Sequence, residues 1–99
     1  REAVRQWIDL MLRQQIDRID NELLEILNKR MQVSREIGQY KKEHSMPVVQ
    51  AARYDTILNN RIKLAEEMGM DGEFMKEVLE AIHGESVRQQ IEVLNNRAK

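Results

Sequence analysis

The sequence predicts an all-α protein with three helices per chain and a very long first helix. Apolar residues recur three or four positions apart from Leu12 to Ile37, which is the stripe of an amphipathic helix. The only proline, Pro47, and the glycine Gly69 separate two further segments with the same period. The length of the first helix exceeds what a chain of 99 residues can cover by itself. We therefore expect a helical homodimer in which a second copy packs antiparallel against it.

The first helix is predicted over residues 12–41, with residues 1–11 as an N-terminal extension or a linker helix from a preceding domain. Residues 1–11 contain no helix breaker and continue the apolar pattern through Trp7, which we expect in core or interface packing. Together these segments have 41 residues, and within them we expect a helix of about 35 residues, or about 50 Å at 1.5 Å per residue.

A break is predicted around residues 43–48. Pro47 disfavours helix for Met46 and is well suited to opening the next helix, which we expect over residues 49–68. Gly69 suits the position after that helix, where a left-handed conformation costs glycine little. His44 is expected to be exposed, and with only two histidines in the chain a multi-histidine metal site has no support.

The third helix is predicted over residues 72–95, with Asp71 as its N-cap. Its stripe carries two polar residues one turn apart, Ser86 and Gln90, where apolar residues would be expected. Gly84 within the helix suggests close packing or room for a ligand. Residues 12–95 thus form the predicted domain, and residues 96–99, with Arg97, form a frayed tail.

Polar residues interrupt the apolar stripes of all three helices: Arg30, Lys41, Arg53, Ser86 and Gln90. At about 100° per residue, Arg30 and Lys41 fall within roughly 20° of each other on the first helix. Because burying unpaired cations is costly, that face needs an anionic partner. If the helices pack around one core, these groups converge on a cationic pocket with neutral donors opposite. Such a pocket suits a small dicarboxylate, since arginine binds carboxylates bidentately.

The alternative is that the cations form salt bridges on the surface of a helical bundle. No carboxylate, however, stands at a stripe position where it would neutralise Arg30 and Lys41 together. The carboxylates that could pair with neighbouring cations at helical spacing are Asp17, Asp20, Glu22 and Glu36.

Arg13 is placed differently from the other cations. It lies about 25 Å before Arg30 along the helix axis and about 100° around it, so it cannot reach the same pocket from its own chain. In an antiparallel dimer it could reach the partner's pocket.

Composition narrows the class of protein. The net charge of −1 argues against non-specific nucleic-acid binding, and no apolar run is long enough to span a membrane. There is no cysteine, which excludes disulfides and thiolate chemistry. We expect a soluble cytoplasmic protein.

These motifs resemble the all-helical chorismate mutases. The pattern LRxxIDxIDxELLxxLxxR over residues 12–30 is similar to the opening helix of that family. So are IGxYK over 37–41, Pro47–Val48, Arg53, and SxxxQ over 86–90. The resemblance covers residues 11–94 without gaps between motifs. It implies an intertwined homodimer with two identical sites that convert chorismate to prephenate, a Claisen rearrangement towards phenylalanine and tyrosine.

The resemblance also implies roles for the site residues. Arg30 and the partner subunit's Arg13 would hold the two substrate carboxylates. Lys41 and Gln90 would hydrogen-bond the ether oxygen, where negative charge grows as the C–O bond breaks. Arg53 and Ser86 would complete the binding shell. A unimolecular pericyclic reaction requires no metal or cofactor, only restraint of the substrate and stabilisation of charge.

Two positions depart from the family pattern. An acidic residue is common where this chain has Gln50, and a glutamate directly follows the arginine where this chain has Tyr54. Those groups address the substrate's ring hydroxyl, so Gln50 or the Tyr54 phenol would have to substitute, unless Tyr54 belongs to the core. Isochorismate–pyruvate lyases share the fold and the cation set, so lyase activity is an alternative.

A non-catalytic helical dimerisation or regulatory module is a further alternative. Family members also occur fused to other shikimate-pathway enzymes, including 3-deoxy-7-phosphoheptulonate synthase. A chain that starts at Arg1 with a helical lead-in would suit a mutase domain from such a fusion.

Overall fold

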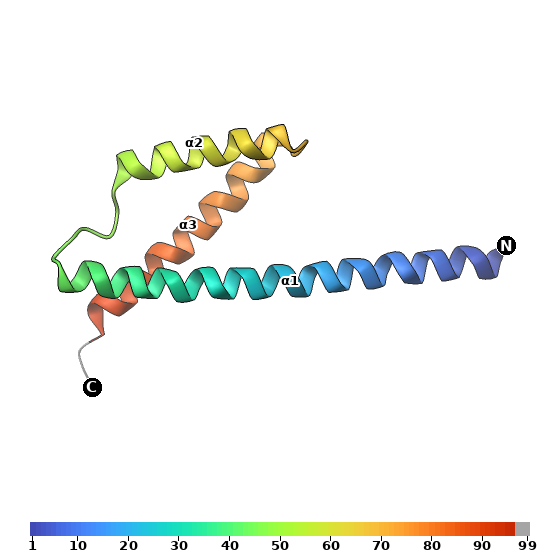
Figure 1. Cartoon of the computed structure of the whole chain (residues 1–99), viewed down its shortest axis with the longest axis horizontal. Helices are drawn as coiled ribbons and strands as arrows, with labels where there is room; N and C mark the ends of the chain where they lie inside the picture. The colour runs from blue at the N-terminus through green and yellow to red at the C-terminus, as the bar shows by residue number, and fades with distance from the viewer. Residues whose placement is uncertain (97–99) are drawn as a thin grey trace. The chain divides into compact units, whose positions relative to one another are not determined.

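A computed structural model describes residues 1–96, which form three α-helices and no strand (Figure 1). They are α1 (Glu2–Glu43), α2 (Ala51–Glu67) and α3 (Gly72–Asn95). None of the three combines the length and the apolar character that crossing a membrane requires. The predicted all-α class with three helices and a very long first helix is confirmed.

Helix α1 is continuous over 42 residues, so residues 1–11 join it directly and it is longer than predicted. The chain divides into two compact units, residues 1–30 and the remainder from Met31. In the first unit every residue of α1 except the half-buried Leu27 is exposed.

The apolar stripe of α1 is exposed in the described chain. Trp7 is 60% exposed, and Ile16 and Leu23 are 56% and 52% exposed. A core position for Trp7 in this chain is therefore wrong, while interface packing stays a prediction. The other two helices have only 17 and 24 residues, which is too short to line a helix of 42 residues.

The start of α2 differs from the prediction. Pro47 does not open the helix, which begins at Ala51 after Gln50 in the N-cap position with φ −122° and ψ 89°. The Lys41 ammonium donates a hydrogen bond to the Val48 carbonyl at 2.7 Å, which holds this segment against α1. The helix begins three residues after that attachment.

The turn between α2 and α3 follows the prediction. Gly69 adopts a φ of +89°, which glycine tolerates and most residues do not. Its N–H donates to the Glu66 carbonyl and that of Met70 to the Ala65 carbonyl, which is a Schellman motif. The Asp71 carboxylate then accepts the Phe74 N–H at 2.9 Å and caps α3. Both the glycine and the N-cap are confirmed.

The second unit has a small core in which α2 packs on α3. Leu58 and Ala65 are its buried apolar residues, and the predicted stripe of α3 is buried or half-buried. Met68, at the C-cap of α2, is 67% exposed.

Helix α3 crosses the C-terminal part of α1 (Figure 1). Lys42 on α1 donates to the carbonyls of Val93 and Asn96 at the end of α3, at 3.4 Å and 2.8 Å. A cation is favourable at that end of a helix. Asn96 is the C-cap, and the rest of the predicted frayed tail, including Arg97, lies outside the described residues.

Candidate functional site

The crossing of α1 and α3 brings two pairs of residues into contact. The hydroxyl oxygens of Ser34 and Ser86 lie 2.6 Å apart and are buried. One turn further along α1, a Cβ on Gly38 would lie only 3.0 Å from the Gln90 Cα. Glycine at position 38 therefore lets α1 approach the backbone of α3 at Gln90.

Lys41 lies one turn beyond Gly38 on the same face of α1. Its ammonium donates to the Val48 carbonyl at 2.7 Å and to Gln90 Oε1 at 3.0 Å. An ammonium has three N–H donors. Within residues 1–96, nothing accepts the third one.

Gln90 is 7% exposed and links Lys41 to Ser86. Its Oε1 accepts from Lys41, and its Nε2 donates to Ser86 Oγ at 3.4 Å. A carboxamide nitrogen carries two hydrogens, so one N–H of Gln90 remains. Lys41 and Gln90 thus each keep one donor, side by side, in a partly desolvated place where hydrogen bonds to developing negative charge are strong.

Arg53 adds positive charge to this group from α2. Burial lowers the pKa of Lys41 below its ordinary value of 10.5, and the charge of Arg53 lowers it further. The described contacts of the Lys41 ammonium are neutral oxygens rather than carboxylates. The surface salt-bridge alternative is therefore wrong for Lys41 among the described residues, and the cationic pocket with neutral donors stays a prediction.

The two positions that depart from the family pattern lie at the start of α2. Gln50 is half-buried and its side chain makes no capping hydrogen bond, while its carbonyl accepts the Tyr54 N–H at 3.0 Å. The Tyr54 ring stacks on His83 of α3, with the ring centroids 3.7 Å apart. Burial raises the pKa of the Tyr54 phenol, and the carboxylates of Glu80 and Asp55 raise it further, so the phenol is neutral at pH 7.

Arg13 and Arg30 belong to the first unit and are both exposed. Arg13 Nε donates to Asp9 at 2.9 Å in an i,i+4 pair on the helix surface. Exposed pairs of this kind contribute only about 0.3–0.5 kcal/mol, so Arg13 is available for a stronger anionic partner. The face of α1 that carries Arg30 was predicted to be buried, and in the described chain it is exposed.

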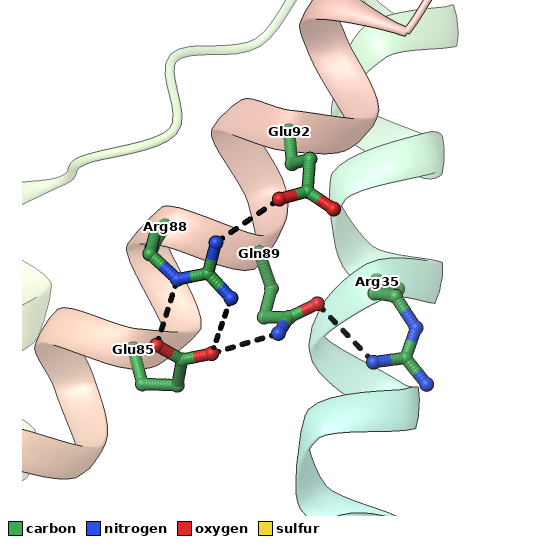
Figure 2. Close-up of polar contacts among 5 residues, drawn as sticks. All are labelled: Arg35, Glu85, Arg88, Gln89 and Glu92. Atoms are coloured by element: carbon green, nitrogen blue, oxygen red, sulfur yellow. Dashed lines mark hydrogen bonds and ion pairs between the residues drawn. The ribbon is translucent and has the colours of Figure 1, made fainter.

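A second polar contact between α1 and α3 lies on the solvent side of the crossing (Figure 2). Arg35 donates to Gln89 at 3.2 Å, and Gln89 donates to Glu85 at 2.7 Å. Arg88 pairs with both Glu85 and Glu92. Hydrogen bonds from Arg88 and Gln89 lower the pKa of Glu85 to about 2. This network is exposed except for the half-buried Glu85 and Gln89, and it connects the same two helices without touching Lys41 or Gln90.

Of the residues predicted from the sequence, hydrogen bonds link Lys41, Gln90 and Ser86, whereas the exposed Arg53 acts on Lys41 through its charge. Sequence reasoning missed three features. It did not single out Ser34, the role of Gly38, or the Val48 carbonyl. Ser34 and Gly38 are small residues four positions apart, the same spacing as Ser86 and Gln90, and that match is a usable signal. The close-packing interpretation of Gly84 is wrong, since a Cβ there would meet nothing within 4 Å.

Comparison with known proteins gives a match over most of the chain. Residues 12–91 match the family described as chorismate mutase type II. The T-protein of Enterobacter agglomerans is 35% identical over 75 residues, covering 76% of this chain and 20% of that protein. The bifunctional chorismate mutase/prephenate dehydratase of Aquifex aeolicus is 34% identical over 76 residues, covering 77% and 21%.

A third relative is closer in length. The 4-amino-4-deoxychorismate mutase of Streptomyces pristinaespiralis is 30% identical over 77 residues, covering 78% of this chain and 60% of that protein. The chain spans about a fifth of the length of the first two relatives.

Proposed function

The chain belongs to the chorismate mutase type II family, and on that premise we propose that it converts chorismate to prephenate. The observation that carries the proposal is the pair of unused donors on Lys41 and Gln90, whose linked atoms lie 3.0 Å apart. The reaction breaks the ether C–O bond and forms a C–C bond within one molecule. No proton, electron pair or group is transferred to the protein.

The transition state places negative charge on the ether oxygen as the C–O bond lengthens. The remaining N–H of Lys41 and that of Gln90 would donate to this oxygen. Both donors are already held, by the Val48 carbonyl and by Ser86, so little reorganisation accompanies the reaction. Removal of one such donor from a site of this kind typically costs about 2.7–4 kcal/mol.

The substrate's two carboxylates need further cations. Arg30 and the partner subunit's Arg13 are the proposed partners, with Arg53 and Ser86 completing the shell. A homodimer supplies Arg13 across subunits, and its interface would cover the apolar stripe of α1. That stripe includes Leu12, Ile16, Ile19, Leu23 and Ile26, each at least 52% exposed in the single chain. Large exposed apolar patches of this kind mark interaction surfaces.

The ring substituent distinguishes chorismate from related substrates. Gln50 and Tyr54, proposed to lie near it, are both neutral at pH 7. A ring substituent with a positive charge would be repelled by Arg53 and Lys41. Neither Gln50 nor Tyr54 supplies a carboxylate to compensate for that repulsion. We therefore propose a hydroxyl-bearing ring as substrate rather than the amino-bearing ring named for the Streptomyces relative.

The direct test is a substrate comparison with the purified protein. Chorismate, isochorismate and 4-amino-4-deoxychorismate are supplied separately, and prephenate, its amino analogue and pyruvate are measured. We expect prephenate from chorismate at the highest kcat/KM. Pyruvate from isochorismate as the main product would identify a lyase, and saturable binding without turnover would identify a sensing module.

Two further proposals concern context. We propose a cytoplasmic location and a partner enzyme that acts on the same precursors, since one relative is named as bifunctional. A 3-deoxy-7-phosphoheptulonate synthase domain, fused or associated, is the partner expected from the resemblance. Co-purification of that synthase activity with the mutase from the source cells tests this proposal, and its absence would contradict it.

A further inference from the structure

Ser34 and Ser86 form a short, buried side-chain hydrogen bond between α1 and α3. Their oxygens lie 2.6 Å apart, against 3.0 Å for Lys41 and Gln90 and 3.2 Å for Arg35 and Gln89. Ser34 is also only 3% exposed. It belongs to none of the groups proposed to contact the substrate, so its buried hydroxyl calls for another role.

The directions of the neighbouring hydrogen bonds follow from what each group can donate. Lys41 can only donate, so Gln90 must present Oε1 to it and Nε2 to Ser86. The Gln90 amide therefore donates to Ser86 Oγ. At 3.4 Å this bond is long, because N–H···O bonds usually measure about 2.7–3.2 Å. A long, weak bond does not by itself fix the position of the Ser86 oxygen.

The short bond to Ser34 supplies that restraint. It occupies either the proton or the second lone pair of Ser86 Oγ and leaves the other lone pair facing Gln90. Lys41 determines which end of the Gln90 amide faces it, and the position of the Ser86 oxygen adds a second restraint on where the Gln90 Nε2 group points. The chain of contacts runs from Ser34 through Ser86 and Gln90 to Lys41, all within the second unit.

We propose that Ser34 is a positioning residue, which acts through Ser86 to aim the free N–H of Gln90 at the substrate's ether oxygen. This rests on the proposed mutase function. Ser34 touches neither the substrate nor the reacting atoms. The Ser34 hydroxyl keeps the free N–H of Gln90 pointed at the ether oxygen, where negative charge develops. Loss of this hydroxyl should therefore lower kcat and leave KM for chorismate nearly unchanged.

The test uses Ser34→Ala, Ser86→Ala and the double variant, with Arg35→Ala as the matched control. Arg35→Ala removes a hydrogen bond between the same two helices on the exposed side. From the usual worth of one hydrogen bond, we expect Ser34→Ala to lower kcat about two- to tenfold. The double variant should match Ser86→Ala alone, because Ser34 acts only through Ser86. Arg35→Ala should have the parent's kcat.

A second measurement does not need turnover. The side-chain amide resonances of Gln90 in an ¹⁵N NMR spectrum are identified by their loss in Gln90→Met. We expect Ser34→Ala to shift them and Arg35→Ala to leave them in place. Unmoved Gln90 resonances with the parent's kcat would overturn the proposal. A double variant whose kcat falls by the product of the two single effects would also overturn it. So would a fall in kcat in Arg35→Ala as large as that in Ser34→Ala. Absence of prephenate from the parent would instead overturn the proposed function, and the NMR comparison would still test Ser34.

Discussion

The substitution Gln90→Glu tests the donor on which the proposed chemistry depends. It replaces Nε2, the donating atom, by an oxygen and keeps the size of the side chain. Once ionised, the new carboxylate loses the donor and places negative charge beside an oxygen that is itself becoming negative. Loss of a transition-state donor costs about 2.7–4 kcal/mol, so kcat at neutral pH should fall about a hundred- to a thousandfold.

Two features of the structure set the pH at which this loss develops. The Lys41 ammonium lies 3.0 Å from Oε1 and favours the ionised form, whereas burial at 7% exposure opposes it. Because these effects oppose each other, we expect the carboxyl group to titrate on the acid side of neutral pH.

The assay measures kcat of the parent and of Gln90→Glu from pH 4 to pH 8 at saturating chorismate. The neutral amide of the parent donates at any pH, so this residue should cause no decline in the parent. The variant should be most active at acid pH and lose up to tenfold per pH unit above its pKa. Thermal unfolding at each pH controls for stability. A variant with the parent's flat profile and rate would show that Gln90 does not face the breaking bond.

Three further predictions address the other parts of the site. Mixing Arg13→Ala with Arg30→Ala should restore some activity, because a mixed dimer has one site that carries both substitutions and one site that carries neither. If subunit exchange is demonstrated and activity does not recover, the shared site is contradicted. The parent's kcat/KM should fall as pH rises through the lowered pKa of Lys41, below the ordinary 10.5. A lysine whose pKa is lowered by folding makes the fold more stable as pH rises from the folded-state pKa towards the unfolded one. A Tm that does not fall over this pH range would therefore show that the loss of activity comes from deprotonation and not from unfolding. Gly38→Ala should lower kcat, because the new Cβ would lie 3.0 Å from the Gln90 Cα. Its effect on Tm should be smaller, because alanine favours the helix by about 1 kcal/mol over glycine and this offsets part of the steric cost. A variant with the parent's kcat would contradict this account of the crossing.

Local signals in the sequence predicted the parts of the fold that depend on a few adjacent residues. Gly69 and Asp71 end one helix and begin the next as predicted, since a left-handed φ and an N-cap each depend on one residue type. The spacing of Ser86 and Gln90 correctly placed both on the buried face of α3.

Features that depend on contacts between distant segments were not predictable in this way. Pro47 permits a helix start, but the chain after it is hydrogen-bonded to Lys41 through the Val48 carbonyl, and α2 begins only at Ala51. Ser34 gains its importance only from the residue opposite it on α3. Exposure of the α1 stripe in the single chain is likewise not revealed by the apolar period alone.

The hydrogen bond from Lys41 to the Val48 carbonyl gives this side chain two tasks at once. The ammonium that is proposed to donate to the substrate also forms a hydrogen bond to residues 44–50 through the Val48 carbonyl. This segment leads directly into α2, the helix that carries Arg53. Truncation of Lys41 would therefore remove a donor and also release the connection that places a second cation. The resulting loss of rate would combine both effects and would overstate the electrostatic contribution of the ammonium. A variant at Lys41 and one at Arg53 should for the same reason be non-additive, even though the two residues lie on different helices.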